Sequence, residues 1–209
     1  MTYTVINEAA NTPGGQKFTN LGIPYTKEIL PKIHMYVWNN ILQQTNPADR
    51  KPIDTVEIFI KDVDGPYEAL TDVNKINVSA VALNKYHGDL KWEFTSLMFH
   101  EMTHVFQWTC VNAIKCNYNL IEGIADYTIL KANYYPSFFA KPETGNKYDQ
   151  GYDVTARFLE YCDTLNPSFP AKLNKMMRYA YADSYFKNLT GKPVQQLWKE
   201  YKAKYGQPI

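Results

Sequence analysis

Two histidines one helical turn apart form the clearest chemical pattern in the sequence. His100 and His104 enclose Glu101 in the order His-Glu-Met-Thr-His. On an α-helix, residues i and i+4 project from one face with about 6 Å of axial rise between them, so both imidazoles can reach one metal ion. Glu101 lies about 100° further around the helix, beside that ion. The pattern predicts a tetrahedral zinc site, with Glu101 as the general base for a zinc-bound water.

A catalytic zinc usually takes three protein ligands and leaves the fourth position to water. The extended metzincin pattern would require a glycine and a third histidine at positions 107 and 110, but the chain has Gln107 and Cys110, which excludes that class. Further on, Glu122 and Asp126 share one helix face. We expect Glu122 to be the third ligand, with Asp126 accepting a hydrogen bond from a ligand histidine. Asp126 as the ligand is the alternative.

The helix that carries the histidines must itself be buried. From Trp92 to Thr109 its apolar residues surround nearly the whole circumference. Strands are predicted upstream from β-branched and aromatic residues, and helices downstream from a period of 3.6. The strands are Tyr3–Ile6, Thr55–Lys61 and the first half of Ile76–Leu83. The helices lie around residues 29–41, 120–131, 150–163, 170–179 and 193–205, and Gly123 would let the second of these pack closely against a neighbour.

These elements predict an α+β fold with a small mixed sheet, a buried active-site helix and a mainly helical C-terminal half. The chain has 209 residues and no internal repeat or low-complexity tract. We therefore expect one domain over residues 1–209, strand-rich to about residue 90 and helical from about residue 91. Because a chain of this length can bury about 70% of its unfolded surface, it needs no metal in order to fold.

Charge and hydropathy exclude other classes. With 22 Lys and Arg against 21 Asp and Glu, the net charge is +1, so neither nucleic acid nor a membrane surface is an expected partner. No segment approaches the roughly 18 apolar residues of a membrane-spanning helix. The N-terminus lacks the regions of a secretory signal, so the chain is either cytosolic or a mature protein. His34 and His87 have no spacing that recommends them as ligands.

Cysteines and glycosylation sequons favour an oxidising compartment. Cys110 and Cys116 are close enough to close a short loop between two helices, whereas Cys162 lies within a helical pattern as a small core residue. Asn77 and Asn188 begin Asn-X-Ser/Thr triplets that could carry N-glycans in a secreted protein.

Several long motifs resemble one known family. They are Phe99–Trp108, Leu120–Tyr127, Gln150–Asp163 and Leu197–Gly206, together with Asn46–Lys51. The chain resembles the plant basic secretory proteins, a zincin-like family of plant and bacterial metallopeptidases, over nearly its whole length. The resemblance implies a zincin-type fold, secretion to the extracellular space (the apoplast), a role in defence, and zinc held by His100, His104 and Glu122.

A peptidase mechanism follows from this resemblance and the residues already placed. Glu101 takes a proton from the zinc-activated water as it attacks a peptide carbonyl. Tyr152, at the start of a helix beyond the ligands, is the candidate second donor to the oxyanion, although core packing or exposure is the common role among 17 tyrosines. Arg157 follows Asp153 by one turn and could anchor the substrate, but a local ion pair is the favoured role. A substrate would extend along an edge strand, for which Ile76–Val81 is the candidate.

Two other functions compete with a secreted zinc metalloendopeptidase acting on peptides or proteins. One is a secreted defence or recognition protein that retains zinc and binds its target without cleaving it. The presence of Glu101 argues against it, because a structural zinc site needs no carboxylate beside its ligands. The other is a cytosolic metallohydrolase, which would have reduced cysteines and no glycans.

Overall fold

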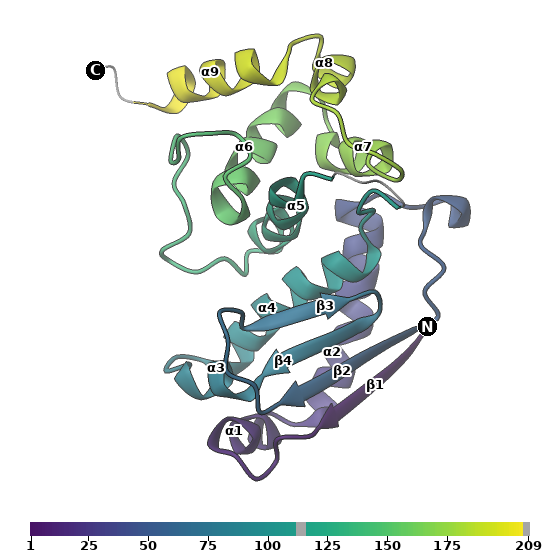
Figure 1. The fold of residues 1–209 in the computed structure, drawn as a ribbon, viewed down its shortest axis with the longest axis vertical. Coiled ribbons are helices and arrows are strands. Elements are labelled where there is room, and N and C mark those ends of the chain that lie inside the picture. Colours follow the sequence, from purple (N-terminus) through teal and green to yellow (C-terminus); the bar gives the residue numbers. More distant parts are fainter. Residues whose placement is uncertain (112–115, 207–209) are drawn as a thin grey trace. The chain divides into compact units, whose positions relative to one another are not determined.

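The computed structural model describes residues 1–111 and 116–206 and has the mixed α+β fold that the sequence predicted (Figure 1). A small four-stranded sheet lies in the N-terminal half, and the C-terminal half is mostly helical. The chain divides into two compact units, the first being Met1–Val37 with Lys51–Phe106 and the second Trp38–Arg50 with Gln107–Ile209. A single zincin-like domain over residues 1–209 stays a prediction. No helix among the described residues is long and apolar enough to cross a membrane.

The first unit contains a mixed sheet. Its strands are β1 (Thr2–Asn7), β2 (Thr55–Lys61), β3 (Ala69–Asp72) and β4 (Lys75–Ser79), in the order β1-β2-β4-β3. β2 runs parallel to both β1 and β4, whereas β3 pairs antiparallel with β4. A two-residue turn suffices between the antiparallel strands, but the parallel pairs require the long connections that carry the helices.

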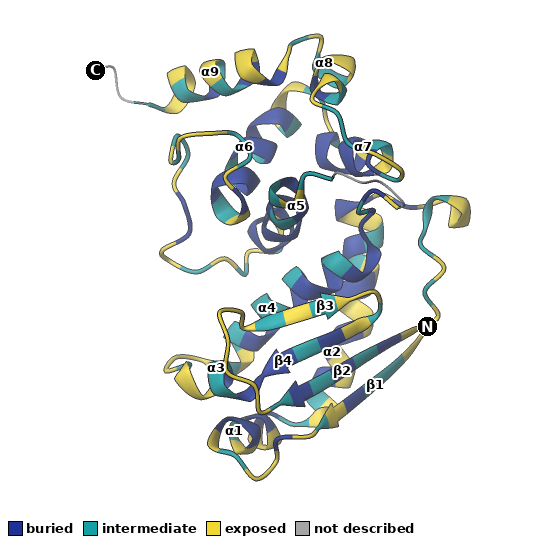
Figure 2. Ribbon diagram, in the orientation of Figure 1, coloured by how far each residue is buried: buried dark blue, intermediate teal, exposed yellow. Residues whose placement is uncertain are grey.

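One face of this sheet is the core of the first unit. Along β2, Val56, Ile58 and Ile60 are fully buried and alternate with partly exposed residues, as the two-residue period of a strand requires. The helices α2 (Ile23–Tyr36) and α4 (Leu90–Phe106) lie along this face, and Figure 2 shows buried residues on both. The sheet therefore serves as the support on which α4 rests.

The structure corrects the predicted edge strand. β4 ends at Ser79 and has a neighbour on each side, so Ile76–Val81 is not an edge. The edge beside α4 is β3, which the sequence did not predict because four residues are too few for a clear pattern. The chain after Ser79 forms the helix α3 (Ala80–Lys85), and the Ser79 hydroxyl caps it by accepting a hydrogen bond from the Ala82 amide.

A second helix that was not predicted, α1 (Pro13–Leu21), packs against α3. Thr12 caps its N-terminus, with its hydroxyl accepting a hydrogen bond from the Gly15 amide at 3.1 Å. A side chain on Gly14 would overlap the carbonyl group of Ala80, so glycine is what allows the two backbones to approach.

Asn77 lies in β4 on the face of the sheet that points away from α4. The register pairs it with Phe59 and Leu70, whereas its neighbours Ile76 and Val78 are buried on the helix side. A glycan on Asn77 would thus lie on the face of the sheet opposite α4.

The second unit is built from helices. They are α5 (Tyr118–Lys131), α6 (Tyr152–Leu165), α7 (Phe169–Met176), α8 (Ser184–Thr190) and α9 (Val194–Tyr205). All but α8 were predicted, within a few residues at each end. Their core is aromatic, with Phe158 central among Phe186, Trp198 and Tyr201. Earlier in the chain, the π-helix η1 (Val37–Ile41) follows α2, and the 3-10 helix η2 (Pro47–Asp49) belongs to the second unit.

The cysteines behave as predicted. Cys110 and Cys116 form a disulfide that joins the chain after α4 to the start of α5. Cys162 is a free, fully buried thiol on α6, and burial raises its pKa well above the usual value.

Candidate metal centre

The histidine pair lies on the last turns of α4. The helix begins where the Asp89 carboxylate accepts hydrogen bonds from the amides of Lys91 and Trp92. One turn apart, the Nε2 atoms of His100 and His104 are 2.9 Å from each other, and the rings meet edge to face with centroids 4.6 Å apart. The two imidazoles therefore present the same nitrogen to the same point.

This geometry fits two ligands of a single metal ion. Two nitrogens bound to tetrahedral zinc at about 2.0–2.1 Å would lie roughly 3.3 Å apart, a few tenths of an ångström more than in the structure. Among the described residues, His100, His104 and Glu122 form a group that could hold a metal ion. Two imidazoles and one carboxylate are a donor set that zinc accepts.

Glu101 is buried on the same helix, and its role as general base stays a prediction. Its side chain is 4% exposed, and its Oε2 atom accepts a hydrogen bond from the Thr71 hydroxyl at 2.5 Å. Thr71 comes from the edge strand β3, so the sequence offered no signal for this contact. Burial of a carboxylate is costly unless it is hydrogen-bonded, and the threonine supplies such a bond.

Lys51 is the first residue of the second segment of the first unit, and it contacts the C-terminal end of α4. Its Nζ atom donates to the main-chain oxygen of His104 at 3.4 Å, where the last turn of α4 leaves carbonyls without helical partners. Desolvation lowers the pKa of Lys51 to about 8.

In the second unit, α5 carries the predicted carboxylates. Asn117 caps this helix through the Leu120 amide. Gly123 packs against Thr155 of α6 so closely that a side chain there would overlap the threonine, which confirms the predicted close approach. Asp126 is 8% exposed. The roles of Glu122 as ligand and Asp126 as its support stay predictions.

Tyr152 is the first residue of α6 and is 48% exposed. Its φ of 46° lies in the left-handed region, which is uncommon for a tyrosine and costs backbone energy. The following turn holds together because Thr155 accepts a hydrogen bond from the Gly151 amide. The role of Tyr152 as oxyanion donor stays a prediction.

The contacts of Arg157 and His34 can be compared with what the sequence predicted for these two residues. Arg157 does form a local ion pair, but with Glu160 at 3.0 Å, because Asp153 instead accepts a hydrogen bond from the Ala140 amide. His34 is a core residue of the first unit, stacked on Phe106 and hydrogen-bonded to a tyrosine hydroxyl.

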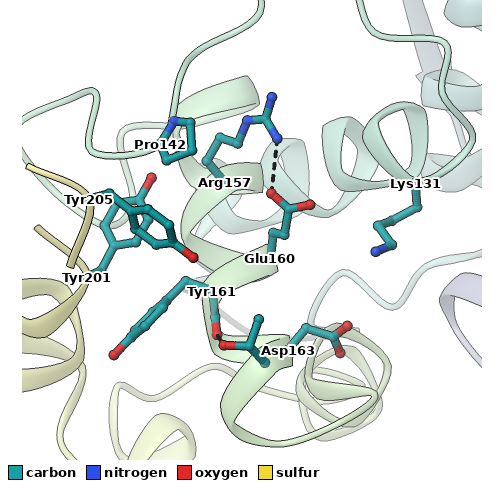
Figure 3. Close-up of a pocket in the computed structure, with 9 residues that line it drawn as sticks. Lys131, Pro142, Arg157, Glu160, Tyr161, Asp163, Tyr201 and Tyr205 are labelled. Atoms are coloured by element: carbon teal, nitrogen blue, oxygen red, sulfur yellow. Dashed lines mark hydrogen bonds and ion pairs between the residues drawn. The ribbon is translucent and has the colours of Figure 1, made fainter.

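A pocket of about 330 Å³ lies in the second unit beside α6 and α9 (Figure 3). Three of its charged side chains are hydrogen-bonded within the protein, Arg157 to Glu160 and Asp163 to the hydroxyl of Tyr127 at 3.0 Å, whereas the ammonium group of Lys131 lies over the ring of Tyr127. The internal partners of Arg157, Glu160 and Asp163 are those that buried polar groups ordinarily require, so these three residues indicate no particular ligand.

Comparison with known proteins assigns the chain to a family of peptidases. The family described as "Peptidase of plants and bacteria" matches residues 1–201, and the chain belongs to it. It is also 43% identical over 60 residues to a "Basic secretory protease" of Boswellia serrata, a match that covers 29% of this chain and 69% of the relative. No solved structure matches the chain. The family resemblance expected from the motifs is thereby confirmed.

Proposed function

We propose that the protein is a zinc-dependent metalloendopeptidase with a zincin-like fold in a single domain. The observation that carries the proposal is the pair of imidazole nitrogens 2.9 Å apart on α4, with the buried carboxylate of Glu101 on the same helix. Membership of a peptidase family supports hydrolysis of peptide bonds as the reaction.

Zinc would be held by His100, His104 and Glu122, a group with the chemistry to bind a metal. Asp126 would accept a hydrogen bond from a ligand histidine and so fix its ring. The alternative assignment exchanges the two carboxylates, with Asp126 as the ligand. Measuring zinc affinity in Glu122→Gln and in Asp126→Asn separates the two, because loss of the ligand costs more affinity than loss of its support.

When bound, zinc would acidify a coordinated water and polarise the scissile carbonyl. Glu101 would take the proton of the attacking water at a carboxylate oxygen and then deliver it to the leaving amine. Tyr152 would donate its hydroxyl hydrogen to the developing oxyanion. Its left-handed backbone and exposed side chain at the start of α6 are consistent with a residue kept for function. Tyr152→Phe is expected to lower kcat and leave KM nearly unchanged.

The substrate backbone would extend along β3, the edge strand that packs beside α4. An edge strand offers unpaired main-chain donors and acceptors, to which an extended peptide can add as another strand. Leu70 is 57% exposed on this strand and could contact a substrate side chain.

Secretion and a role in defence complete the proposal. The relative from Boswellia serrata is named a secretory protease, and the disulfide of this chain is typical of oxidising compartments such as the apoplast. Asn188 is exposed on α8 and Asn77 is half-buried in β4, so Asn188 is the more accessible of the two glycan acceptors.

The decisive experiment measures zinc content and cleavage together. Wild-type protein should bind one zinc and cleave members of a peptide library, whereas Glu101→Gln should keep the zinc and lose cleavage. Glu93→Gln removes a carboxylate from the same helix two turns earlier and should retain both properties. If wild-type protein binds zinc and cleaves nothing, the protein is instead a binding protein that retains its metal.

A further inference from the structure

The hydroxyl of Thr71 makes the shortest side-chain contact to Glu101 in the described structure. Thr71 Oγ1 is 2.5 Å from Glu101 Oε2 and 3.3 Å from the main-chain oxygen of the same residue. An ionised carboxylate can only accept hydrogen bonds, so the threonine is the donor. Bonds from a hydroxyl to a carboxylate are typically 2.5–2.7 Å long and about twice as strong as those between neutral groups.

The fold explains how a residue 30 positions away reaches the helix. Thr71 pairs with Ile76 of β4, and the alternation of the strand directs both toward the buried face of the sheet. The next strand residues, Leu70 and Asp72, are exposed on the opposite face. Thr71 is thus aimed at α4, which packs beside β3.

We propose that Thr71 is a positioning residue for the general base. The proposal rests on the metallopeptidase function above and adds a residue to it. By donating to Oε2, Thr71 holds the carboxylate of Glu101 in one rotamer and leaves Oε1 to receive the proton. Because Glu101 is 4% exposed, few water molecules can take over this bond, and its loss would let the carboxylate turn away from the reacting water.

Two substitutions at Thr71 test the effect of the hydroxyl and the effect of the side-chain shape separately. Thr71→Val keeps the β-branched shape and removes the donor, whereas Thr71→Ser keeps the donor and removes a methyl group. Thr71→Val should lower kcat about 10- to 100-fold with KM and zinc affinity nearly unchanged, by analogy with the loss of a hydrogen bond that orients a metal ligand. Thr71→Ser should stay within about threefold of wild type in kcat.

Thr4→Val is the matched control. Thr4 lies on β1, the other edge of the same sheet, and is likewise half-buried. The substitution Thr4→Val should leave kcat and KM as in wild type. Equal losses of kcat in Thr71→Val and Thr71→Ser would overturn the proposal, since the hydroxyl would then not be what matters. If Thr71→Val does not fold, Thr71→Ala serves as the second variant without a hydroxyl.

A measurement on metal-free protein tests the contact independently of catalysis. Thermal unfolding is compared for wild type, Thr71→Val, Glu101→Ala and the double variant after removal of metal. If the two side chains interact, the Tm shift of Thr71→Val should largely disappear in the Glu101→Ala background. Additive shifts would overturn the proposal. A coupled pair in a protein that cleaves no peptide would instead refute the peptidase function and leave the contact standing.

Discussion

The close packing of α5 on α6 allows us to work out how much one methyl group added at Gly123 would lower the free energy of unfolding. In Gly123→Ala the new Cβ would lie 2.6 Å from the Cβ of Thr155 and closer still to its Cγ2. Carbon atoms in contact prefer about 3.5–4.0 Å, so the helices must separate by about 1 Å at this point. Thr155 cannot rotate away without loss, because its hydroxyl bonds both the Gly151 amide and the Tyr148 carbonyl.

Overpacking of a core costs about 1–3 kcal/mol, and the higher helix propensity of alanine offsets up to about 1 kcal/mol. We therefore expect Gly123→Ala to lower the free energy of unfolding by about 1–2 kcal/mol. Urea unfolding followed by circular dichroism would measure this as a lower midpoint with an unchanged slope.

Gly65→Ala is the control for this prediction, since nothing lies within 4 Å of a Cβ built at Gly65. It should unfold at the wild-type midpoint. Thr155→Ser removes Cγ2 and keeps the hydroxyl, so Gly123→Ala should cost less in that background than in wild type. An unfolding midpoint for Gly123→Ala equal to that of wild type would refute the reasoning, because α5 and α6 would then not be in such close contact.

Three further predictions concern metal, disulfide and pH. Removal of zinc by a chelator should abolish peptide cleavage while circular dichroism retains the helical signal, because the core does not depend on the metal. Replacing Cys110 and Cys116 by serine should lower the free energy of unfolding, measured by denaturant titration, by about 2 kcal/mol. The value is modest because the disulfide closes only a short loop. Lys51 has a folded pKa of about 8, below its ordinary value, so the unfolded chain binds more protons above pH 8 and stability should rise from pH 8 to 10. This lysine should account for about 1–2 kcal/mol of the rise in the free energy of unfolding. Its share is the difference between the pH profiles of unfolding free energy for wild type and Lys51→Met, and parallel profiles would contradict the prediction.

Local patterns in the sequence predicted the longer helices, although not α1, α3 and α8, and they predicted the histidine pair that lies within one helix. In a helix, the i,i+4 spacing of His100 and His104 makes the two rings face one point. The apolar residues around the histidines favour a buried helix for this segment. Cys110 and Cys116 are similarly close in sequence, so their pairing could be foreseen.

The tertiary structure decided what depends on distant segments meeting. Strand order made β3 the edge beside α4 and moved Ile76–Ser79 inside the sheet. The same order brought Thr71 to Glu101 across 30 residues, and the course of the chain brought Lys51 to the main chain of His104 across 53. No periodicity within either segment encodes such contacts, because pairing between strands is set by the burial of a whole face of the sheet. The candidate site residues on α4 could thus be predicted from the sequence, whereas the residues that contact them, Thr71 and Lys51, could be found only from the tertiary structure.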